Sequence, residues 1–278
     1  MRLADISALA RSVDPRYPTV GAILALSLVV TVGGTAFQLV QGPGLQEALL
    51  WGVNAGLAVF LAWALGRELD PDHELSAFVG AGLSLAGRVL FGAPALLALA
   101  WMLLALRLVN RSTGLPAKIQ DTLGFLGLGL WLTWQESWVY GLATTIAFFL
   151  DSRLFRPHPR HLGFAVLTLL GTLGLTLMQS TSNRDGWQGT GLLWAMVAAT
   201  LLFVLIIPAS RKLEATGDVT GEPLRPARLQ AAQILALLTG LFTAAWSGQA
   251  GVIDLLPLWA AMLGTPLYWL VASLVVRR

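Results

Sequence analysis

The sequence of 278 residues contains no cysteine, and only 12% of its residues are charged. Without cysteine the chain has no disulfide, no thiolate nucleophile and no cysteine-ligated metal or iron–sulfur site. Soluble domains carry about 25% charged residues, and no polar stretch in this chain exceeds about twenty residues, so we expect no separate soluble domain. The signatures H-E-x-x-H, G-x-S-x-G and Walker A are also missing.

What the sequence has instead is a high apolar content. Hydrophobic residues make up 56% of the chain, and its mean hydropathy is +0.70. Apolar runs near the ~20 residues that a helix needs to cross a bilayer recur along the whole length. The fold class predicted is therefore all-α, a polytopic transmembrane helix bundle of about ten spans. We place these spans at residues 19–40, 47–66, 75–90, 94–109, 120–134, 138–152, 162–179, 190–209, 228–247 and 254–275.

The Lys and Arg residues indicate how these spans are oriented. With both termini in the cytoplasm, sixteen of the 18 lie in cytoplasmic segments and only Arg88 and Arg184 lie in outer turns. Because cytoplasmic loops are enriched in Lys and Arg, we predict a multi-pass protein of the cytoplasmic (inner) membrane of a bacterium or archaeon, with both termini inside. The net charge of +3 does not indicate a nucleic-acid partner, since the basic residues lie beside the spans.

The predicted domain organisation is simple. Residues 1–17 form a cytoplasmic N-terminal segment, and residues 18–278 form a single integral membrane domain. Within the N-terminal segment Leu3, Ile6, Leu9 and Val13 recur near helical spacing, which favours an amphipathic helix in the membrane interface. A disordered tail is the alternative.

The ten spans pair into five hairpins whose return helices resemble one another, so repeated hairpins are one interpretation. Two of the hairpins, 75–109 and 120–152, leave only about 15 residues for each helix. Such a helix is ~22 Å long, shorter than the ~30 Å hydrocarbon core. We therefore predict short or re-entrant hairpins, and backbone that turns inside a membrane must be buried in protein or line a wet cavity.

The stretch "LGRELDPDHELS", residues 65–76, is the most highly charged of the predicted turns. One interpretation is a solvated turn in which Asp70 or Asp72 caps the following helix. The other is a site in which Asp70, Asp72 and His73 bind Mg²⁺, and through it a diphosphate, because carboxylates are ligands for hard cations.

A second polar group lies on the same predicted cytoplasmic face. His158 and His161 occur in "FRPHPRH", and Arg156 or Arg160 would join them if Asp, His and Arg side chains converge at the cytoplasmic mouth. The two Asp-rich motifs of intramembrane prenyltransferases are not present, because the chain has only Asp70-x-Asp72 and, at the end of the sixth span, the lone Asp151.

The tips of the two short hairpins carry the remaining candidates. Arg88 lies at the first tip, and Trp134, Gln135 and Glu136 lie at the second. Charges that reach only partway into a bilayer are unfavourable unless they are paired, so we predict an Arg88–Glu136 pair or a shared cavity lining. The alternative is that both side chains extend to the outer surface. Asn54, a polar residue within a span, is expected to form an interhelical hydrogen bond or to line the same cavity.

The function expected from these features is that of a small-molecule carrier or permease, because broken helices that line a midplane site are how such proteins bind a solute. A membrane-embedded enzyme acting on a lipid or isoprenoid diphosphate at the cytoplasmic face is one alternative, with Asp70, Asp72 and His73 as catalytic residues. A non-catalytic scaffold subunit is another. No cofactor is expected except Mg²⁺ under the enzyme alternative, and the expected partners are the lipid bilayer and a small-molecule ligand.

Overall fold

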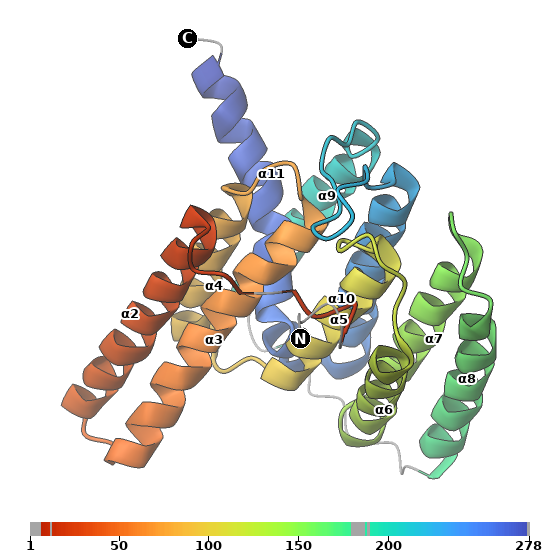
Figure 1. Cartoon of the computed structure of the whole chain (residues 1–278). Helices are drawn as coiled ribbons and strands as arrows, with labels where there is room; N and C mark the ends of the chain where they lie inside the picture. The colour runs from red at the N-terminus through yellow and green to blue at the C-terminus, as the bar shows by residue number, and fades with distance from the viewer. Residues whose placement is uncertain (1–6, 12, 179–186, 188–189, 277–278) are drawn as a thin grey trace. The chain divides into compact units, whose positions relative to one another are not determined.

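The computed structural model describes residues 7–11, 13–178, 187 and 190–276. These residues form α-helices and no β-strand, apart from an isolated bridge between Thr216 and Pro223. The helices (Figure 1) are α2 (Pro18–Gln41), α3 (Leu45–Leu69), α4 (Ser76–Phe91), α5 (Leu96–Asn110), α6 (Ile119–Gln135), α7 (Trp138–Arg153), α8 (Arg160–Met178), α9 (Gly191–Ala209), α10 (Pro226–Asp254) and α11 (Leu256–Val276).

The all-helical fold class is confirmed, and each of the ten predicted segments coincides with one helix. Six helices, α2, α3, α8, α9, α10 and α11, are long and apolar enough to cross a membrane. The other four have 15 to 17 residues each, which makes them about 22 to 26 Å long. They are the four helices of the two hairpins that the sequence predicts to be short.

Helix α10 differs from the prediction. The sequence "WSGQAG" suggested a turn after residue 247, but the helix continues to Asp254 and contains a kink at Gly248. Gly248 has φ 63° and ψ −138°, a combination that is essentially restricted to glycine. Residues after the kink resume helical hydrogen bonding, so the predicted turn is a bend within the helix.

The chain forms two compact units, each discontinuous in sequence. Unit 1 comprises Met1–Ser12, Trp101–Trp194 and Val204–Val252, and unit 2 comprises Val13–Ala100, Ala195–Phe203 and Ile253–Arg278. Each unit is described separately below. The single membrane domain predicted for residues 18–278 stays a prediction.

In unit 2 small residues allow helices to approach closely. Helices α2 and α3 lie side by side (Figure 1), and a Cβ atom on Gly52 of α3 would lie 2.4 Å from the carbonyl oxygen of Thr31 on α2. A Cβ on Gly264 of α11 would lie 2.5 Å from the backbone nitrogen of Gly80 on α4. Contacts through small residues are typical of helix packing in membranes, so these glycines fix the helix spacing in this unit.

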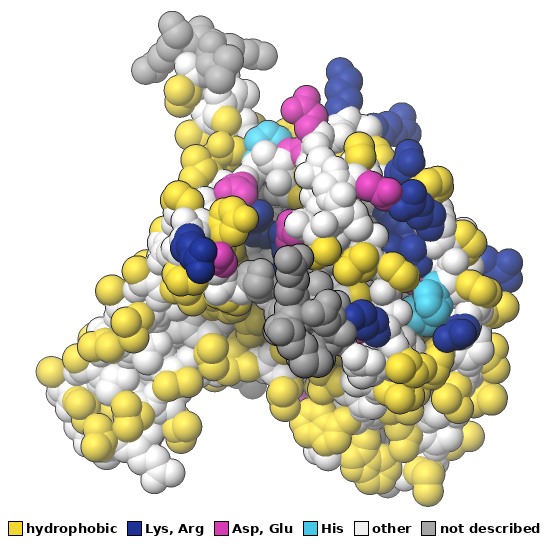
Figure 2. All heavy atoms as spheres, viewed as in Figure 1, with side chains coloured by type: hydrophobic (Ala, Val, Ile, Leu, Met, Phe, Trp, Pro, Cys, Tyr) yellow, Lys and Arg dark blue, Asp and Glu magenta, His cyan; other side chains and the backbone are white. Residues whose placement is uncertain are grey.

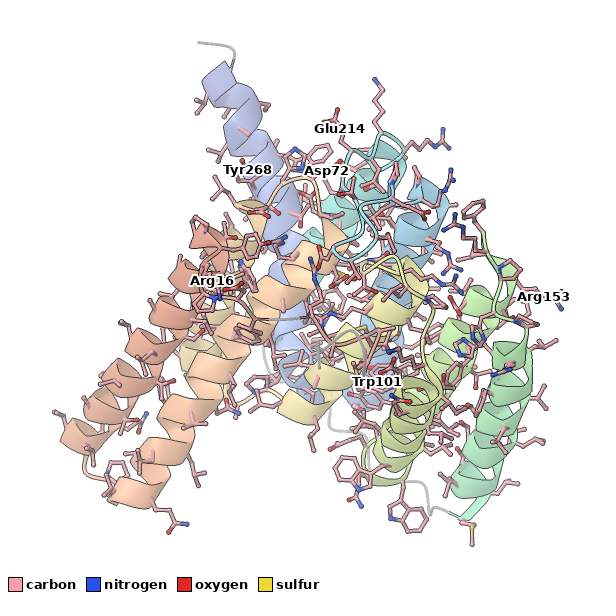
Figure 3. The ribbon with its side chains drawn as sticks, viewed as in Figure 1. Arg16, Asp72, Trp101, Arg153, Glu214 and Tyr268 are labelled. Carbon is pink, nitrogen blue, oxygen red and sulfur yellow. The ribbon has the colours of Figure 1, made fainter. Side chains whose placement is uncertain are left out.

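In unit 1 an aromatic core joins the end of α5 to α6 and α7. Trp101, labelled in Figure 3, is fully buried, and its ring stacks on Phe125 at 6.0 Å between centroids. The ring of Tyr140 meets Trp101 edge-on at 5.2 Å. The indole Nε1 donates a hydrogen bond of 3.0 Å to Thr144 Oγ1, so the polar atom of this buried side chain is satisfied.

The N-terminal segment is not helical where the structure describes it. Residues 7–11 form no helix, whereas residues 1–6 and 12 of the predicted amphipathic helix lie outside the described residues. Leu9 is buried in unit 1, and the backbone nitrogen of Ala8 donates to Asp121 at 2.8 Å. Arg107 donates to the carbonyl oxygen of Leu9 at 3.0 Å. Leu9 therefore packs against the protein, and its predicted interfacial role is wrong.

Candidate anion-binding site

The centre of the candidate site is the carboxylate of Asp151, which is fully buried near the end of α7. Arg111 binds it in a bidentate manner, with Nε 2.9 Å from Oδ1 and Nη2 3.1 Å from Oδ2. Arg228 Nη1 donates to Oδ1 at 2.8 Å, and His161 Nδ1 lies 2.8 Å from Oδ2. Each carboxylate oxygen thus accepts two hydrogen bonds, which is what a buried charge requires.

The side chains around Asp151 come from helix ends that meet at one end of unit 1. Arg111 follows directly after α5, His161 lies in the first turn of α8, and Arg228 lies in the first turn of α10. Arg228 also donates to the carbonyl oxygens of Val109 and Phe155, at 2.8 and 2.9 Å. Because these oxygens belong to a helix end and a loop, the arginine satisfies backbone acceptors that lack intrahelical partners.

A pocket of about 240 Å³ opens beside this buried group. It is lined by Asn110, Arg111, Gly114, Phe155, Arg156, Glu222, Pro223, Leu224, Arg225 and Arg228. Four of these residues are arginines and one is an acid. We call this pocket, with these ten residues, the arginine pocket.

Unusual backbone conformations position two of the four arginines. Arg111 has φ 52° and Arg156 has φ 56°, in the left-handed region that non-glycine residues rarely adopt. The two residues are also bonded to each other, since Arg111 Nη1 donates to the carbonyl oxygen of Arg156 at 2.7 Å. Such strained residues cluster at ligand-binding sites, and the inference runs from the observed strain to function.

The acid in the pocket is paired with one of the arginines. Arg156 and Glu222 form two hydrogen bonds, one of them 3.2 Å between Nη2 and Oε1. The hydrogen bond and charge of Arg156 lower the pKa of Glu222, and those of Glu222 raise the pKa of Arg156. Glu222 therefore stays ionised, and it neutralises one arginine only.

Arg225 is a second exposed cation of the pocket, besides Arg156. Its guanidinium lies 4.1 Å from the centroid of the Phe155 ring. Within the described part of the chain, no carboxylate forms a hydrogen bond or ion pair with it. Figure 2 shows the Lys and Arg side chains of unit 1 gathered at the end where α7 ends and α10 begins. Arg153, which Figure 3 labels, belongs to this surface but does not line the pocket.

His158 extends the group behind the pocket. Its ring stacks on that of His161, with 4.2 Å between centroids. Burial lowers the pKa of His158, and the neighbouring His161 lowers it further. A neutral imidazole is therefore favoured in the loop between α7 and α8, which avoids adding a positive charge next to the arginines.

The chemistry available in the pocket is that of anion binding. Guanidinium groups present planar forks of N–H donors that match phosphate and carboxylate oxygens. The lining contains no hydroxyl or imidazole side chain, and its acid is paired with Arg156. The arrangement is thus suited to holding an anion and not to transferring a proton.

At the predicted site of Asp70, Asp72 and His73, the structure shows hydrogen bonds to both carboxylate oxygens of Asp70. Asp70 Oδ1 lies 2.9 Å from His73 Nδ1, and Trp269 Nε1 of α11 donates to Asp70 Oδ2 at 2.9 Å. One oxygen of the buried carboxylate is thereby bonded within the α3–α4 turn, and the other joins this turn to α11. Asp72 and Tyr268, labelled in Figure 3, lie at this end of unit 2.

A Mg²⁺ site at these residues stays a prediction. Among the described residues no three or more His, Asp or Glu side chains form a group that could hold a metal ion, so such a site would use fewer protein ligands. The prediction that Asp70 or Asp72 caps the following helix is wrong, because α4 begins after Leu75 without a side-chain cap and Asp70 bonds to His73 and Trp269 instead. The buried hydrogen bonds to α11 explain why Asp70 is only 6% exposed in a turn predicted to be solvated.

Arg88 and Asn54 are brought together in unit 2. Arg88 Nε donates to Asn54 Oδ1 at 2.9 Å, and the guanidinium lies 4.6 Å from the Trp51 ring centroid. The interhelical hydrogen bond predicted for Asn54 is therefore confirmed, between α3 and α4. Glu136 belongs to unit 1, so the Arg88–Glu136 pair stays a prediction.

The other residues of the second hairpin tip lie on the surface of unit 1. Trp134, Gln135 and Glu136 are all exposed around the end of α6. Their predicted role in lining a cavity stays a prediction. The sequence reasoning missed Asp151, Arg111, Arg225 and Arg228 as site residues, although each lies at or beside a predicted span end.

The chain has no match among known proteins in three comparisons, with protein-family models, with curated proteins and with solved structures.

Proposed function

We propose that the protein is a multi-pass membrane protein that carries a small anionic solute. The observation on which the proposal depends is the arginine pocket, in which four arginines face one glutamate in about 240 Å³. Positive charge of this kind, fixed on a helix bundle, attracts and orients anions. The solute of the carrier or permease predicted from the sequence is therefore proposed to be negatively charged.

The proposed topology has ten spans with both termini in the cytoplasm of a bacterium or archaeon. The short helices α4 to α7 then cross or re-enter the membrane as two hairpins. All four arginines of the pocket lie in segments that the Lys and Arg distribution assigns to the cytoplasm. In this topology the arginine pocket is the cytoplasmic mouth of the carrier.

The kink in α10 supports transport over static binding. The helix begins with Arg228 at the pocket and bends at Gly248 near its other end. Interrupted helices are common in secondary transporters, where they line the solute site and change conformation during transport. A bend on the helix that carries a pocket arginine would couple occupancy of the pocket to movement of that helix.

The test is uptake of labelled anions by the purified full chain reconstituted in liposomes. A panel of phosphate, sulfate and small carboxylates is compared with cationic and neutral solutes. An anion at 100 times its dissociation constant should also stabilise the detergent-purified protein by about 2.7 kcal/mol. Arg225→Gln should reduce uptake, and Arg153→Gln, an exposed arginine outside the pocket, should not.

Two results would contradict the carrier. If no anion stabilises the protein, the pocket is not an anion site. If an anion binds through Arg225 but is not taken up, the protein binds anions without carrying them.

The alternative is a membrane-embedded enzyme acting on a lipid or isoprenoid diphosphate at the cytoplasmic face. It is favoured by the number of arginines, since a diphosphate carries more charge than most small solutes. It would require Mg²⁺, for which Asp70, Asp72 and His73 were the predicted ligands. Hydrolysis or transfer of a labelled diphosphate with Mg²⁺, and loss of that activity in Asp72→Ala, would favour the enzyme.

A further inference from the structure

We propose that unit 1 binds a lipid phosphate, with the phosphate group in the arginine pocket and the hydrocarbon chain in an apolar groove between α7 and α10. The inference rests on the proposed function, because it assigns the chemical class of the anion that the arginine pocket holds. It adds a second binding surface, the groove, which has no role in binding a small inorganic anion.

The groove has a volume of about 220 Å³. It is lined by Val139, Leu142, Ala143, Ile146 and Leu150 of α7 and by Ala231, Ile234, Leu235, Leu238, Thr239 and Phe242 of α10. Thr239 is the one polar residue of this lining, and its hydroxyl donates to the carbonyl oxygen of Leu235 at 2.8 Å. The groove therefore offers no free polar group and suits a hydrocarbon.

The groove begins where the arginine pocket ends. On α7, Leu150 directly precedes Asp151, and on α10, Ala231 follows Arg228 by three residues. Three residues are about 4.5 Å along a helix. Since Arg228 binds Asp151 at 2.8 Å, the pocket and the near end of the groove are joined on both helices.

From this end the groove runs along both helices in register. Its far end is at Val139 on α7 and Phe242 on α10, eleven residues from the near end on each helix, or about 16 Å. Helix α7 ends and α10 begins at the pocket, so the two helices run in opposite directions along the groove. This geometry fits one extended chain attached to a charged group at the pocket end.

The charges match a phosphate ester. Four arginines are opposed by Glu222 in the lining and by Asp151 behind it, which leaves two positive charges in excess. A phosphate monoester carries about −1.5 to −2 at pH 7. A lipid phosphate therefore neutralises the pocket, whereas a neutral or zwitterionic headgroup leaves it charged.

The groove also distinguishes a lipid from a protein partner. Ile234 and Phe242 are 45% and 47% exposed in its wall, and burying such side chains under hydrocarbon is favourable. An extended peptide laid along the same wall would bring backbone N–H and C=O groups against an apolar surface without hydrogen-bond partners, which is unfavourable. The occupant is accordingly a hydrocarbon chain.

The experiment measures equilibrium binding to the purified full chain in a neutral maltoside detergent. The probes are oleoyl lysophosphatidic acid, oleoyl lysophosphatidylcholine and inorganic phosphate. The first has both the phosphate monoester and the chain, the second has the same chain with a zwitterionic headgroup, and the third has no chain. We expect lysophosphatidic acid to bind at least about tenfold more tightly than either.

Two variants separate the two halves of the site. Arg225→Gln should weaken lysophosphatidic acid and inorganic phosphate alike, by about tenfold. Ala231→Phe places a large side chain at the near end of the groove, and it should remove the preference for lysophosphatidic acid without changing the binding of inorganic phosphate. Matched controls are Arg153→Gln, at an exposed arginine outside the pocket, and Ala198→Phe, at an exposed alanine of α9 outside the groove.

The outcomes distinguish this inference from the proposed function. Equal binding of lysophosphatidic acid and inorganic phosphate, both weakened by Arg225→Gln, would overturn the lipid and leave the anion site. A preference for lysophosphatidic acid that survives Ala231→Phe would overturn the assignment of its chain to the groove. If no phosphate probe binds, the lipid phosphate is overturned, whereas the anion carrier is overturned only if the sulfate and carboxylates of the transport panel also fail to stabilise the protein.

Discussion

Asp151 is the single residue on which most of the site depends. It is fully buried and accepts hydrogen bonds from Arg111, Arg228 and His161. We predict that Asp151→Asn lowers the free energy of unfolding by about 3 kcal/mol or more, because it leaves buried arginines without their counter-charge. The measurement is thermal unfolding of the purified variant in detergent.

The control for this substitution is Glu47→Gln, which removes a charge from an exposed acid in α3. A surface change of that kind alters stability by no more than about 0.5 kcal/mol. If Asp151→Asn were as mild as the control, the buried group would contribute little to the fold.

His158 gives the protein a specific dependence on pH. Because burial and the nearby His161 lower the pKa of His158, the unfolded chain binds more protons than the folded one between that lowered pKa and about 6.5. Stability therefore falls as the pH falls through this window and is recovered at higher pH.

The variant that tests this dependence is His158→Phe, which keeps a ring stacked on His161 but cannot be protonated. Melting temperatures measured from pH 5 to pH 8 should fall less steeply at the acidic end for the variant than for the original chain. Parallel curves for the two proteins would show that His158 does not titrate in this range.

Single residues of the site could be predicted only in part. The sequence identified His158, His161 and Arg156 as candidate site residues, since they lie close together in one predicted loop. Asp151 was set aside as a lone acid because its arginine partners are 40 and 77 residues away. No local spacing reveals contacts that form only when distant helix ends meet.

At the scale of helices, the contact between α6 and α7 depends on a glycine. A Cβ on Gly129 would lie 2.2 Å from Thr144 Oγ1, a buried hydroxyl that accepts the hydrogen bond from Trp101. We predict that Gly129→Ala lowers the free energy of unfolding by about 1 to 3 kcal/mol through overpacking. The loss is measured by thermal unfolding, with tryptophan fluorescence reporting on the core.

Gly127, two residues earlier in the same helix, is the matched control. A Cβ there would meet no atom within 4 Å, so Gly127→Ala should be neutral or stabilise by up to about 1 kcal/mol through helix propensity. A loss of equal size at both positions would mean that the helix, and not the contact with Thr144, is sensitive to the change.

The helices themselves were the most predictable part of the molecule. Runs of apolar residues bounded by charged or Gly- and Pro-containing segments predicted every described helix to within three residues, except for the end of α10. There the sequence around Gly248 resembles a turn, but the backbone continues as a helix after one non-helical residue. In an apolar environment a helix satisfies its own backbone groups, which favours a kink over an open turn.

At the scale of the whole molecule, the proposed topology can be tested because the chain has no cysteine. An introduced cysteine is then the only thiol that a membrane-impermeant maleimide can label. Glu136 and Glu214 are both exposed, in the loops after α6 and α9, and Glu214 is labelled in Figure 3. We predict that Glu136→Cys is labelled in intact cells and that Glu214→Cys is labelled only after permeabilisation.

The two positions are separated by α7, α8 and α9. Three crossings place them on opposite sides of the membrane, whereas labelling of both from the outside would mean that one of these helices does not cross. If both cysteines are labelled only after permeabilisation, the α6–α7 turn does not lie on the outer side of the membrane.

The class of the molecule follows from its composition, but its ligand does not. The mean hydropathy of the chain and the length of its apolar runs are enough to indicate a helical membrane protein. The arginine pocket, in contrast, requires residues 110–114, 155–156 and 222–228 to lie together, and three separate loops supply them.

The bonds of Asp151 also order the events during synthesis of the chain. Arg111 is already made when Asp151 leaves the ribosome, and His161 follows ten residues later. Arg228 comes 77 residues after Asp151, which at 5–20 residues per second is a delay of about 4 to 15 s. For those seconds the nascent chain contains only one of the two arginines that bind the carboxylate of Asp151. The charge balance and the arginine pocket are completed when α10 emerges.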